Sequence, residues 1–277
     1  MNVQAWVAEA KRMPRAKRKV ALRPIGATVA YQTTLRAIML RIIGEARGFV
    51  ASEVLPAAIS ARGQLQRKDL GWFQRAMRTL RDLLSGFVDG AREEVRRATE
   101  TEEQRHRRRF HEAMRSAIGV GLAAAIVSEG IEAEVAAAAQ RNVALIRGLA
   151  DEMAKRVELV LIGAITLGTS NAEIAKLLTK EFGFSTNRAA LIARDQAASF
   201  NGDLNRIRQT RMGVTEYQWS TSLDERVRGN PEGRYPNARP SHYAREGETF
   251  RWNAPPSDGH PGAAINCRCV ARAVIEF

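Results

Sequence analysis

The strongest constraint on the fold is a helical spacing of apolar residues that covers more than half of the chain and then stops. Apolar side chains recur every three or four residues from about Leu22 to Phe182, most clearly in Leu35–Ile43, Leu80–Phe87 and Met153–Leu167. This spacing places apolar side chains on one face of a helix, and abundant alanine favours helices over strands. We expect about four to six helices packed on one another in this region.

Particular residues set the expected ends of these helices. Ser170, followed three residues later by Glu173, is a capping-box signal and predicts a helix over Ala172–Phe182. A separate helix is expected over Asn187–Arg211. The expected breaks in the preceding helical region are Pro56, Gly63 and Ser128–Gly130.

After Met212 the helical spacing ends, and Gly, Pro, Asn, Asp and Ser become frequent. Three short segments there have the composition of β-strands: Glu216–Trp219, Thr249–Trp252 and Arg268–Ile275. The sequence therefore predicts a mainly α protein, in which a multi-helix N-terminal region is followed by a compact α+β C-terminal module. The expected parts are a basic arm over residues 1–20, a helical domain over 21–168 and a C-terminal domain over 169–277.

Basic residues gather in the N-terminal part of the chain. Residues 1–115 hold 24 Lys and Arg against 12 Asp and Glu, which is nearly all of the formal net charge of +13. This segregation favours an interaction surface for nucleic acid or an acidic protein, although a solvated basic surface has the same composition. The candidate contact residues are Arg15, Lys17, Arg18 and Lys19 in the arm, and Arg105, Arg107, Arg108 and Arg109 further on.

The second basic group belongs to a densely charged stretch, Glu93–Arg115. Its acids and bases are mixed at three- and four-residue spacings, so the stretch is also typical of an exposed helix with weak ion pairs. The next stretch, Ser116–Ser128, is apolar and uncharged, but it is shorter than the roughly 20 residues that a bilayer requires. We expect it to be buried inside the helical domain.

The cysteine count and the N-terminal residues bear on where the protein works. Two cysteines in 277 residues exclude a disulfide scaffold. Basic residues interrupt the apolar residues near the N-terminus, so no signal peptide is expected. With no transmembrane segment expected either, the sequence predicts a soluble intracellular or particle-bound protein.

The helix expected over Asn187–Arg211 carries a polar face. At spacings of seven, four and three residues it contains Arg194, Asn201, Asn205 and Arg208. Guanidinium and carboxamide donors on one face suit the recognition of backbone carbonyls or phosphates. The remaining apolar residues would be buried on the other side, as in an ordinary amphipathic helix.

The sharpest chemical pattern lies at the C-terminal end. Cys267 and Cys269 form a C-x-C pair, His260 lies seven residues before the pair, and His242 lies further upstream. Alternate residues on a strand face the same side, so both sulfurs could reach one metal ion. Two thiolates and two imidazoles would complete a tetrahedral zinc site. The pattern also fits two buried, reduced cysteines beside a hydrogen-bonded histidine, or a nucleophilic cysteine.

Several motifs in the last third of the chain resemble, in residue type and order, those of the phage Mu F-like minor head proteins. They are Ile192–Gln196, Gly213–Arg228, His242–Phe250, Pro255–Gly262 and Asn266–Cys269. The resemblance covers roughly residues 170–277. Family members commonly carry a histidine soon after the segment that ends here at Arg228. In this chain Gly229–Ser241 intervenes before His242, which we interpret as a surface loop insertion.

The resemblance implies a minor head protein of a tailed phage, present in several copies per virion. Such a protein is expected in the virion head near the portal vertex, and in the host cytoplasm during assembly. It would act in procapsid assembly, and in DNA packaging or ejection. The implied partners are the portal protein, other head proteins and double-stranded DNA. No residue is assigned a catalytic role; the motif residues expected to be structural are Arg194, Asp195, Gln196, Trp219, Asp224, Arg226, Arg228, Gly247, Pro256 and Arg268.

Two other classes of function are consistent with parts of the sequence. A nuclease would use His242 or His260 together with nearby arginines, but the paired acids of two-metal phosphoryl chemistry are missing. A non-specific DNA-binding protein would account for the basic residues 1–115, although that region lacks aromatic residues interleaved with the basic ones.

Overall fold

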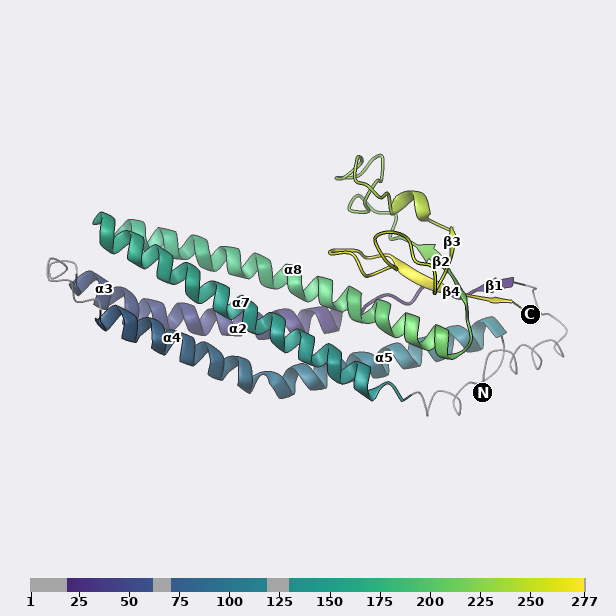
Figure 1. The fold of residues 1–277 in the computed structure, drawn as a ribbon, viewed down its shortest axis with the longest axis horizontal. Helices are drawn as coiled ribbons and strands as arrows, with labels where there is room; N and C mark the ends of the chain where they lie inside the picture. Colours follow the sequence, from purple (N-terminus) through teal and green to yellow (C-terminus); the bar gives the residue numbers. More distant parts are fainter. Residues whose placement is uncertain (1–18, 62–70, 119–129, 277) are drawn as a thin grey trace. The chain divides into compact units, whose positions relative to one another are not determined.

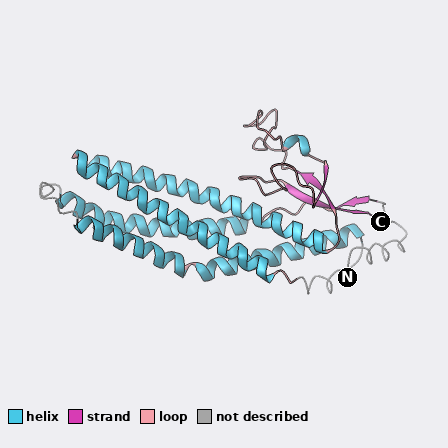
Figure 2. Cartoon of the chain, viewed as in Figure 1, coloured by secondary structure: helices cyan, strands magenta, loops and turns pink. Residues whose placement is uncertain are grey.

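The computed structural model describes residues 19–61, 71–118 and 130–276, and these form a mainly α protein with a small antiparallel sheet (Figure 1, Figure 2). The predicted fold class is therefore confirmed. Arg15, Lys17, Arg18 and Gly63 lie outside the described residues, as does most of Ser116–Ser128. No helix within the described ranges is long and apolar enough to cross a membrane.

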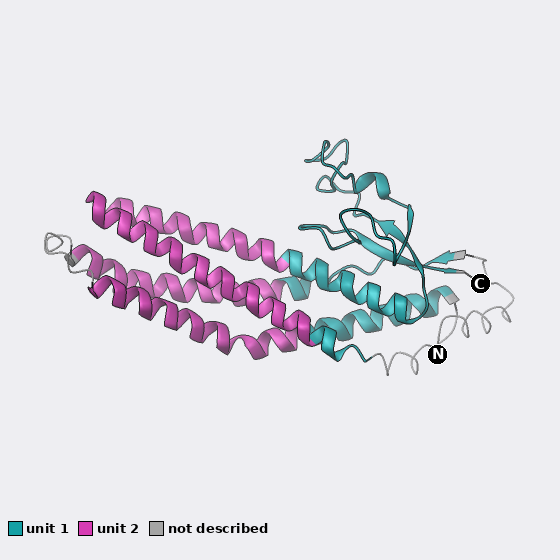
Figure 3. Cartoon of the chain, in the orientation of Figure 1, with its two compact units in different colours: residues 1–32, 99–135, 194–277 teal, residues 33–98, 136–193 magenta. Residues whose placement is uncertain are grey.

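The helices follow the chain in the order α2 (Val29–Phe49), α3 (Leu55–Ala61), α4 (Gly71–Gly90), α5 (Arg92–Ile118), α7 (Glu132–Leu167) and α8 (Asn171–Arg211). Contacts divide the chain into two compact units (Figure 3). The helical unit comprises residues 33–98 and 136–193, and the sheet unit comprises residues 1–32, 99–135 and 194–277. These limits differ from the expected borders at residues 20 and 168, because α2, α5, α7 and α8 each supply residues to both units.

In the helical unit, segments of α2, α4, α7 and α8 run lengthwise beside one another (Figure 3). Helix α4 shows how the apolar spacing builds this core: Phe73, Met77, Leu80, Leu84 and Val88 are buried at intervals of three and four residues. Such side chains form a stripe on one face of a helix, and burying that face stabilises the bundle.

The apolar stripes expected from the sequence are narrower in the structure. Leu83 and Phe87 of α4 are 38% and 37% exposed, because the core-facing stripe passes through Leu80 and Leu84 instead. At the end of α7, Leu167 is 82% exposed. The period was predicted correctly, whereas the position of each stripe's edge depends on the neighbouring helices.

Helix α8 corrects the prediction of two separate helices, since it continues from Asn171 through Arg211. The N–H of Glu173 donates to Oγ of Ser170 at 3.3 Å, which confirms the predicted cap. No break follows Phe182, because the hydroxyls of Ser185 and Thr186 donate to carbonyls four residues earlier within the helix.

Pro56 also fails to separate two helices. It is the second residue of α3, and the preceding residues Val50–Val54 form π-helical turns that join α2 to α3. Proline is tolerated in the first turn of a helix, and a local π-helical stretch accommodates a change in hydrogen bonding. Gly130, with φ of +58°, precedes α7 as expected for a break.

Helix α5 is not the fully exposed helix that its charge pattern indicated. Its residues Thr99, Glu102, His106 and Phe110 are buried at spacings of three and four. Ion pairs of the expected kind do occur on the exposed side, for example between Glu93 and the arginines three and four residues later. One face of the helix therefore packs against its neighbours in spite of the charges.

The sheet has the strand order β1-β4-β2-β3, and all of its pairs are antiparallel. Strands β2 (Glu216–Ser220), β3 (Thr249–Arg251) and β4 (Val270–Glu276) lie close to their predicted positions. Strand β1 (Lys19–Ala21) was not predicted, because Lys19 was placed in the basic arm. It pairs with β4, with Lys19 opposite Glu276.

The polar face of α8 binds backbone carbonyls, as one of the two predicted alternatives stated. Nδ2 of Asn201 and Nδ2 of Asn205 both donate to the carbonyl oxygen of Ile25, at 2.9 and 3.0 Å. One turn further on, Nε2 of Gln209 donates to the carbonyl of Ala271 at 3.0 Å. These contacts fix the segment after β1 and the start of β4 against α8.

Candidate metal centre and arginine-lined cavity

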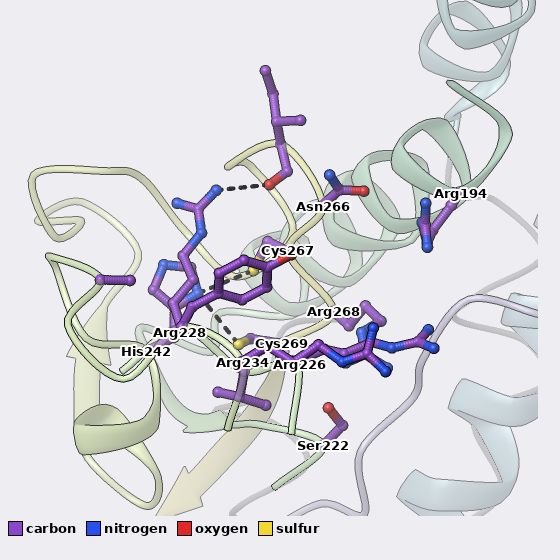
Figure 4. A pocket seen from close by; sticks show the side chains of 14 residues that line it. Arg194, Ser222, Arg226, Arg228, Arg234, His242, Asn266, Cys267, Arg268 and Cys269 are labelled. Carbon is purple, nitrogen blue, oxygen red and sulfur yellow. Dashed lines mark hydrogen bonds between the residues drawn. The ribbon is translucent and has the colours of Figure 1, made fainter. Parts of the chain in front are cut away.

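Three potential metal ligands converge in the sheet unit: His242, Cys267 and Cys269. Nδ1 of His242 lies 3.5 Å from Sγ of Cys267 and 3.5 Å from Sγ of Cys269 (Figure 4). The three side chains are buried, and their ligand atoms all lie within 4.8 Å of one another. The prediction that the C-x-C spacing brings both sulfurs to one side is therefore confirmed.

Local structure explains why these residues meet. Cys267 and Cys269 lie directly before β4, in a segment that packs with the buried Tyr217 and Trp219 of β2. His242 immediately precedes a short 3-10 helix, Tyr243–Arg245. Its ring contacts the Trp219 ring edge-on at a centroid distance of 5.2 Å. The sheet thus holds the two sulfurs, and Trp219 orients the imidazole toward them.

The loop Gly229–Ser241, which precedes His242, is closed at its base. The N–H of Tyr243 donates to the carbonyl of Arg228 at 3.0 Å, so the chain returns to the point at which it left. Gly229 has φ of +76°, and a Cβ there would lie 2.1 Å from Oγ of Ser241. Only glycine fits this turn without displacing its neighbour. The closed loop therefore leaves His242 next to Arg228 in space, although 13 residues separate them in the sequence.

A carboxylate and an arginine support the histidine from behind. Nε2 of His242 lies 2.7 Å from Oδ2 of Asp258, and the other carboxylate oxygen accepts from Arg245 at 2.7 Å. The guanidinium of Arg245 also lies over the Trp219 ring at 4.8 Å. Asp258 and Arg245 were not among the site residues predicted from the sequence. A carboxylate two residues before His260, in a Gly- and Pro-rich segment, was the available signal for Asp258.

The residues of this cluster shift one another's pKa. Hydrogen bonds from Cys269 and His242 lower the pKa of Cys267 to about 4, and the same pairing raises the pKa of Cys269. Burial alone would lower the pKa of His242, but its contacts with Cys267 and Asp258 raise it above its ordinary value. Burial opposes ionisation of Asp258, yet Arg245 and His242 lower its pKa. The pKa shifts of Cys267, His242 and Asp258 each favour a charged group beside an opposite one, whereas the shift of Cys269 favours its neutral thiol.

His260, the fourth ligand predicted from the sequence, does not join the other three. Its Nδ1 lies 3.0 Å from the hydroxyl of Tyr217, and its ring packs on that of Trp252 at a centroid distance of 4.8 Å. Burial and the positive charge of Arg206 lower the pKa of His260. In sequence His260 is nearer to the cysteines than His242 is, but the chain turns at Pro261 and Gly262 and separates them.

The three converging side chains line a cavity of about 500 Å³. Its wall includes five arginines and no Asp or Glu from the part of the chain that the structure describes (Figure 4). The arginines are Arg194, Arg226, Arg228, Arg234 and Arg268. The lining also contains polar groups from Ser222 and Asn266 and the ring of Tyr235. This composition suits an anionic occupant.

Neighbouring acids engage some of these arginines but not all. Arg268 pairs with Asp224, and Arg226 and Arg234 lie near Glu225. Arg228 donates instead to the carbonyl of Ile265 at 2.8 Å. Nε of Arg194 is buried and has no hydrogen-bond partner among the described residues.

The remaining motif residues hold the loops around the cavity. Asp195 accepts from the N–H of Asn266 at 2.9 Å, which ties the segment before the cysteines to α8. Gly247, with φ of +79°, donates its N–H to the carbonyl of Trp219. The carbonyl of Pro256 accepts from Gly259 at 2.9 Å. Gln196 is partly buried on α8.

The predicted N-terminal contact residues differ in burial and in their hydrogen-bond partners. Arg109 donates to the carbonyl of Gly26 at 2.6 Å, and Arg107 lies 3.9 Å from Glu103. Arg105 is partly buried, whereas Arg108 is exposed. Arg109 is therefore engaged in the fold, which makes it a weaker candidate for contact with a partner than the sequence alone indicated.

Residues 155–272 match the family model described as Phage Mu protein F like protein. The match extends from α7 to β4 and includes the three converging ligands and the whole cavity lining. It confirms the resemblance expected from the sequence.

The chain is also similar to an uncharacterized protein of Haemophilus influenzae. The two are 34% identical over 151 residues, which cover 54% of this chain and 31% of that protein. The chain thus matches about a third of the length of this relative. No solved structure matches the chain.

Proposed function

We propose that this protein is a minor head protein of a tailed bacteriophage, associated with the portal vertex and active in procapsid assembly. The observation that carries the proposal is the family match over residues 155–272. That match includes every residue that lines the cavity, so the proposed function rests on one continuous region and not on isolated motifs.

A structural role accounts for the site better than catalysis does. The carboxylate nearest the cluster, Asp258, is held by both His242 and Arg245. A general base needs access to a substrate proton. The described residues that line the cavity include no Asp or Glu, and their one histidine, His242, directs Nδ1 at the two cysteine sulfurs. We infer that the arginine-lined cavity is used for docking.

The proposed partners are the portal protein and other head proteins, and the proposed location is the virion head, with several copies per particle. Co-purification from phage-infected cells tests this directly. We expect tagged protein to co-purify with the portal protein and with assembled heads. Recovery of the protein only outside heads, with no portal protein bound, would contradict the proposal.

Contact with packaged DNA is a second candidate role, which would link the protein to DNA packaging or ejection. It rests on the excess of Lys and Arg in residues 1–115 and on the exposure of Arg108. Binding to duplex DNA should weaken steeply as salt rises, because displaced counterions drive such binding. An affinity that is the same at low and high salt would exclude phosphate contact.

A further inference from the structure

We propose that His242, Cys267 and Cys269 bind a zinc ion whose fourth coordination position opens into the arginine-lined cavity. The sequence pattern predicted four protein ligands, including His260, whereas the structure brings three together. Three protein ligands and one open position are the arrangement of zinc sites that exchange their fourth ligand. This inference does not depend on the proposed role in phage heads.

The distances agree with tetrahedral coordination. Zinc–sulfur bonds of about 2.3 Å and zinc–nitrogen bonds of about 2.0–2.1 Å place sulfur and nitrogen about 3.6 Å apart in a tetrahedral site. Nδ1 of His242 lies 3.5 Å from each sulfur. The two sulfur atoms lie within 4.8 Å of each other, against about 3.8 Å in a tetrahedral site, so a metal ion would fit after they approach each other by about 1 Å or less.

Hydrogen bonding alone does not satisfy this arrangement. Asp258 accepts a hydrogen bond from Nε2 of His242, which leaves the lone pair of Nδ1 directed at both sulfurs. Nδ1 can share one proton with only one sulfur at a time, although it lies 3.5 Å from both. A cation between the three atoms would accept the lone pair and both sulfurs together. A carboxylate behind a ligating histidine is also the usual support in zinc sites.

The ligand types select zinc. Thiolate and imidazole ligands in tetrahedral geometry favour zinc over magnesium or calcium, which bind oxygen. Two thiolates would also neutralise a divalent ion, so a buried ion would carry no excess charge. The zinc would join the segment before β4 to the start of the 3-10 helix, two parts of a region that contains few regular elements.

The fourth ligand would come from the cavity, because the described residues place no fourth histidine, cysteine or carboxylate within the cluster. All three ligand residues line the cavity. We expect water at the open position, and we expect a small oxyanion to displace it. Arg194 and Arg228 both line the cavity, and neither forms an ion pair with another described residue, so both could receive the anion.

The first test measures metal content and affinity. We expect about one zinc per chain in the full-length protein by native mass spectrometry. Cys267→Ser, Cys269→Ser and His242→Gln should each lose the metal, while the matched control His260→Gln should retain it. Retention of zinc by all three variants, or no zinc in the wild-type protein loaded under reducing conditions, would overturn the site.

Asp258→Asn provides a variant that keeps every ligand, in case the ligand variants fail to fold. Loss of the supporting carboxylate should weaken zinc binding by about 10- to 100-fold in a chelator competition. Unchanged affinity in this variant would contradict the proposed orientation of His242.

The second test addresses the open position by replacing zinc with cobalt(II). We expect a thiolate-to-cobalt charge-transfer band and the strong visible bands of a tetrahedral site. Inorganic phosphate should shift the visible bands, while chloride at equal ionic strength should shift them less. Arg194→Gln should weaken the phosphate effect and leave the metal content unchanged. Visible bands that do not respond to phosphate would rule out an exchangeable position that faces the cavity.

Discussion

Different kinds of interaction stabilise the helical unit and the sheet unit, each taken by itself. In the helical unit, buried residues are mainly apolar and recur along each helix. Most of its ion pairs, such as Arg147 with Asp89, are solvent-exposed. Exposed ion pairs contribute little to stability, so burial of apolar side chains dominates there. The sheet unit instead buries polar groups whose partners come from distant parts of the chain.

The clearest example in the sheet unit surrounds Arg208, which is 1% exposed. Its guanidinium donates to Nδ1 of His106 and to Glu103. Nε2 of His106 then donates to Oδ1 of Asn205 at 3.2 Å. Each buried polar group satisfies another, so the removal of one leaves the others unpaired. Stability in the helical unit is thus spread over many residues, whereas in the sheet unit it is concentrated in a few.

The largest effect should come from Arg208→Met. The substitution keeps much of the side-chain volume but leaves Glu103 and His106 without their shared partner. Breaking a buried charged pair in this way costs about 3–5 kcal/mol of the free energy of unfolding. Urea denaturation would measure the loss. The exposed neighbour Arg206→Ala is the control and should change stability by about 0.5 kcal/mol or less. A similar small effect in both variants would contradict a concentrated network.

The next largest loss of stability should come from a core substitution in the helical unit. Leu161 of α7 is fully buried, and Leu161→Ala should cost about 2–5 kcal/mol through lost burial and the cavity that remains. Leu159, two residues earlier, is 60% exposed, and Leu159→Ala should have a far smaller effect. Thermal and urea unfolding of the pair would check this. Equal losses would mean that the outer face of α7 is covered in solution.

Substitution of two glycines by alanine should change stability in opposite directions. Gly262 has φ of +92°, and a Cβ there would lie 2.9 Å from the carbonyl oxygen of Ala198. Gly262→Ala should therefore lower stability by about 1–3 kcal/mol through backbone strain. Gly183 lies inside α8, and a Cβ there would meet no atom within 4 Å, so Gly183→Ala should raise stability by about 0.5–1 kcal/mol. Destabilisation by both variants would show that α8 does not tolerate a side chain at residue 183.

The smallest effect is a pH dependence from His106. Burial, together with the charge of Arg208, holds the pKa of His106 well below its ordinary value of 6.5. The unfolded chain therefore binds a proton first as pH falls. The contribution of His106 is present above about pH 6.5 and is lost below it, by at most about 1.4 kcal/mol per pH unit.

This pH effect can be separated from that of the other histidines. The pKa of His260 is also lowered, whereas that of His242 is raised, so these two act in opposite directions. Unfolding curves between pH 7 and 5 should show a smaller slope for His106→Gln than for the wild-type protein. An unchanged slope would mean that His106 is already protonated or accessible in the folded state.

The contrast between the units also explains what could be predicted from the sequence. Apolar spacing predicted the helices of the helical unit, since each helix carries its own period. Strand composition located β2, β3 and β4. Strand β1 was missed because its three residues are too few to show a period, and its partner in the sheet, β4, lies at the other end of the chain. The break after Phe182 was wrong, because polar residues there are compatible with a continuing helix.

The sequence predicted which residue types form the candidate site, but not which particular residues come together. The C-x-C spacing predicted that both sulfurs share a side. The choice between His242 and His260 depended on where two loops return to the sheet, which sequence distance does not specify. Arg245 and Asp258 act through His242, so no motif of their own indicates them. Carbonyls were one of the two partners that the sequence predicted for the carboxamides of α8, the other being phosphates. The identity of the bound carbonyl, that of Ile25, required the fold.

The closed base of the loop Gly229–Ser241 has an evolutionary consequence. The hydrogen bond between Arg228 and Tyr243 keeps His242 in place whatever the length of the loop between them. Arg234, Tyr235 and Ala238 of the same loop form part of the cavity wall. The loop therefore contributes to the cavity wall, whereas the hydrogen bond at its base fixes the position of His242. Selection can change its length and sequence to admit a new partner without disturbing the histidine beneath it.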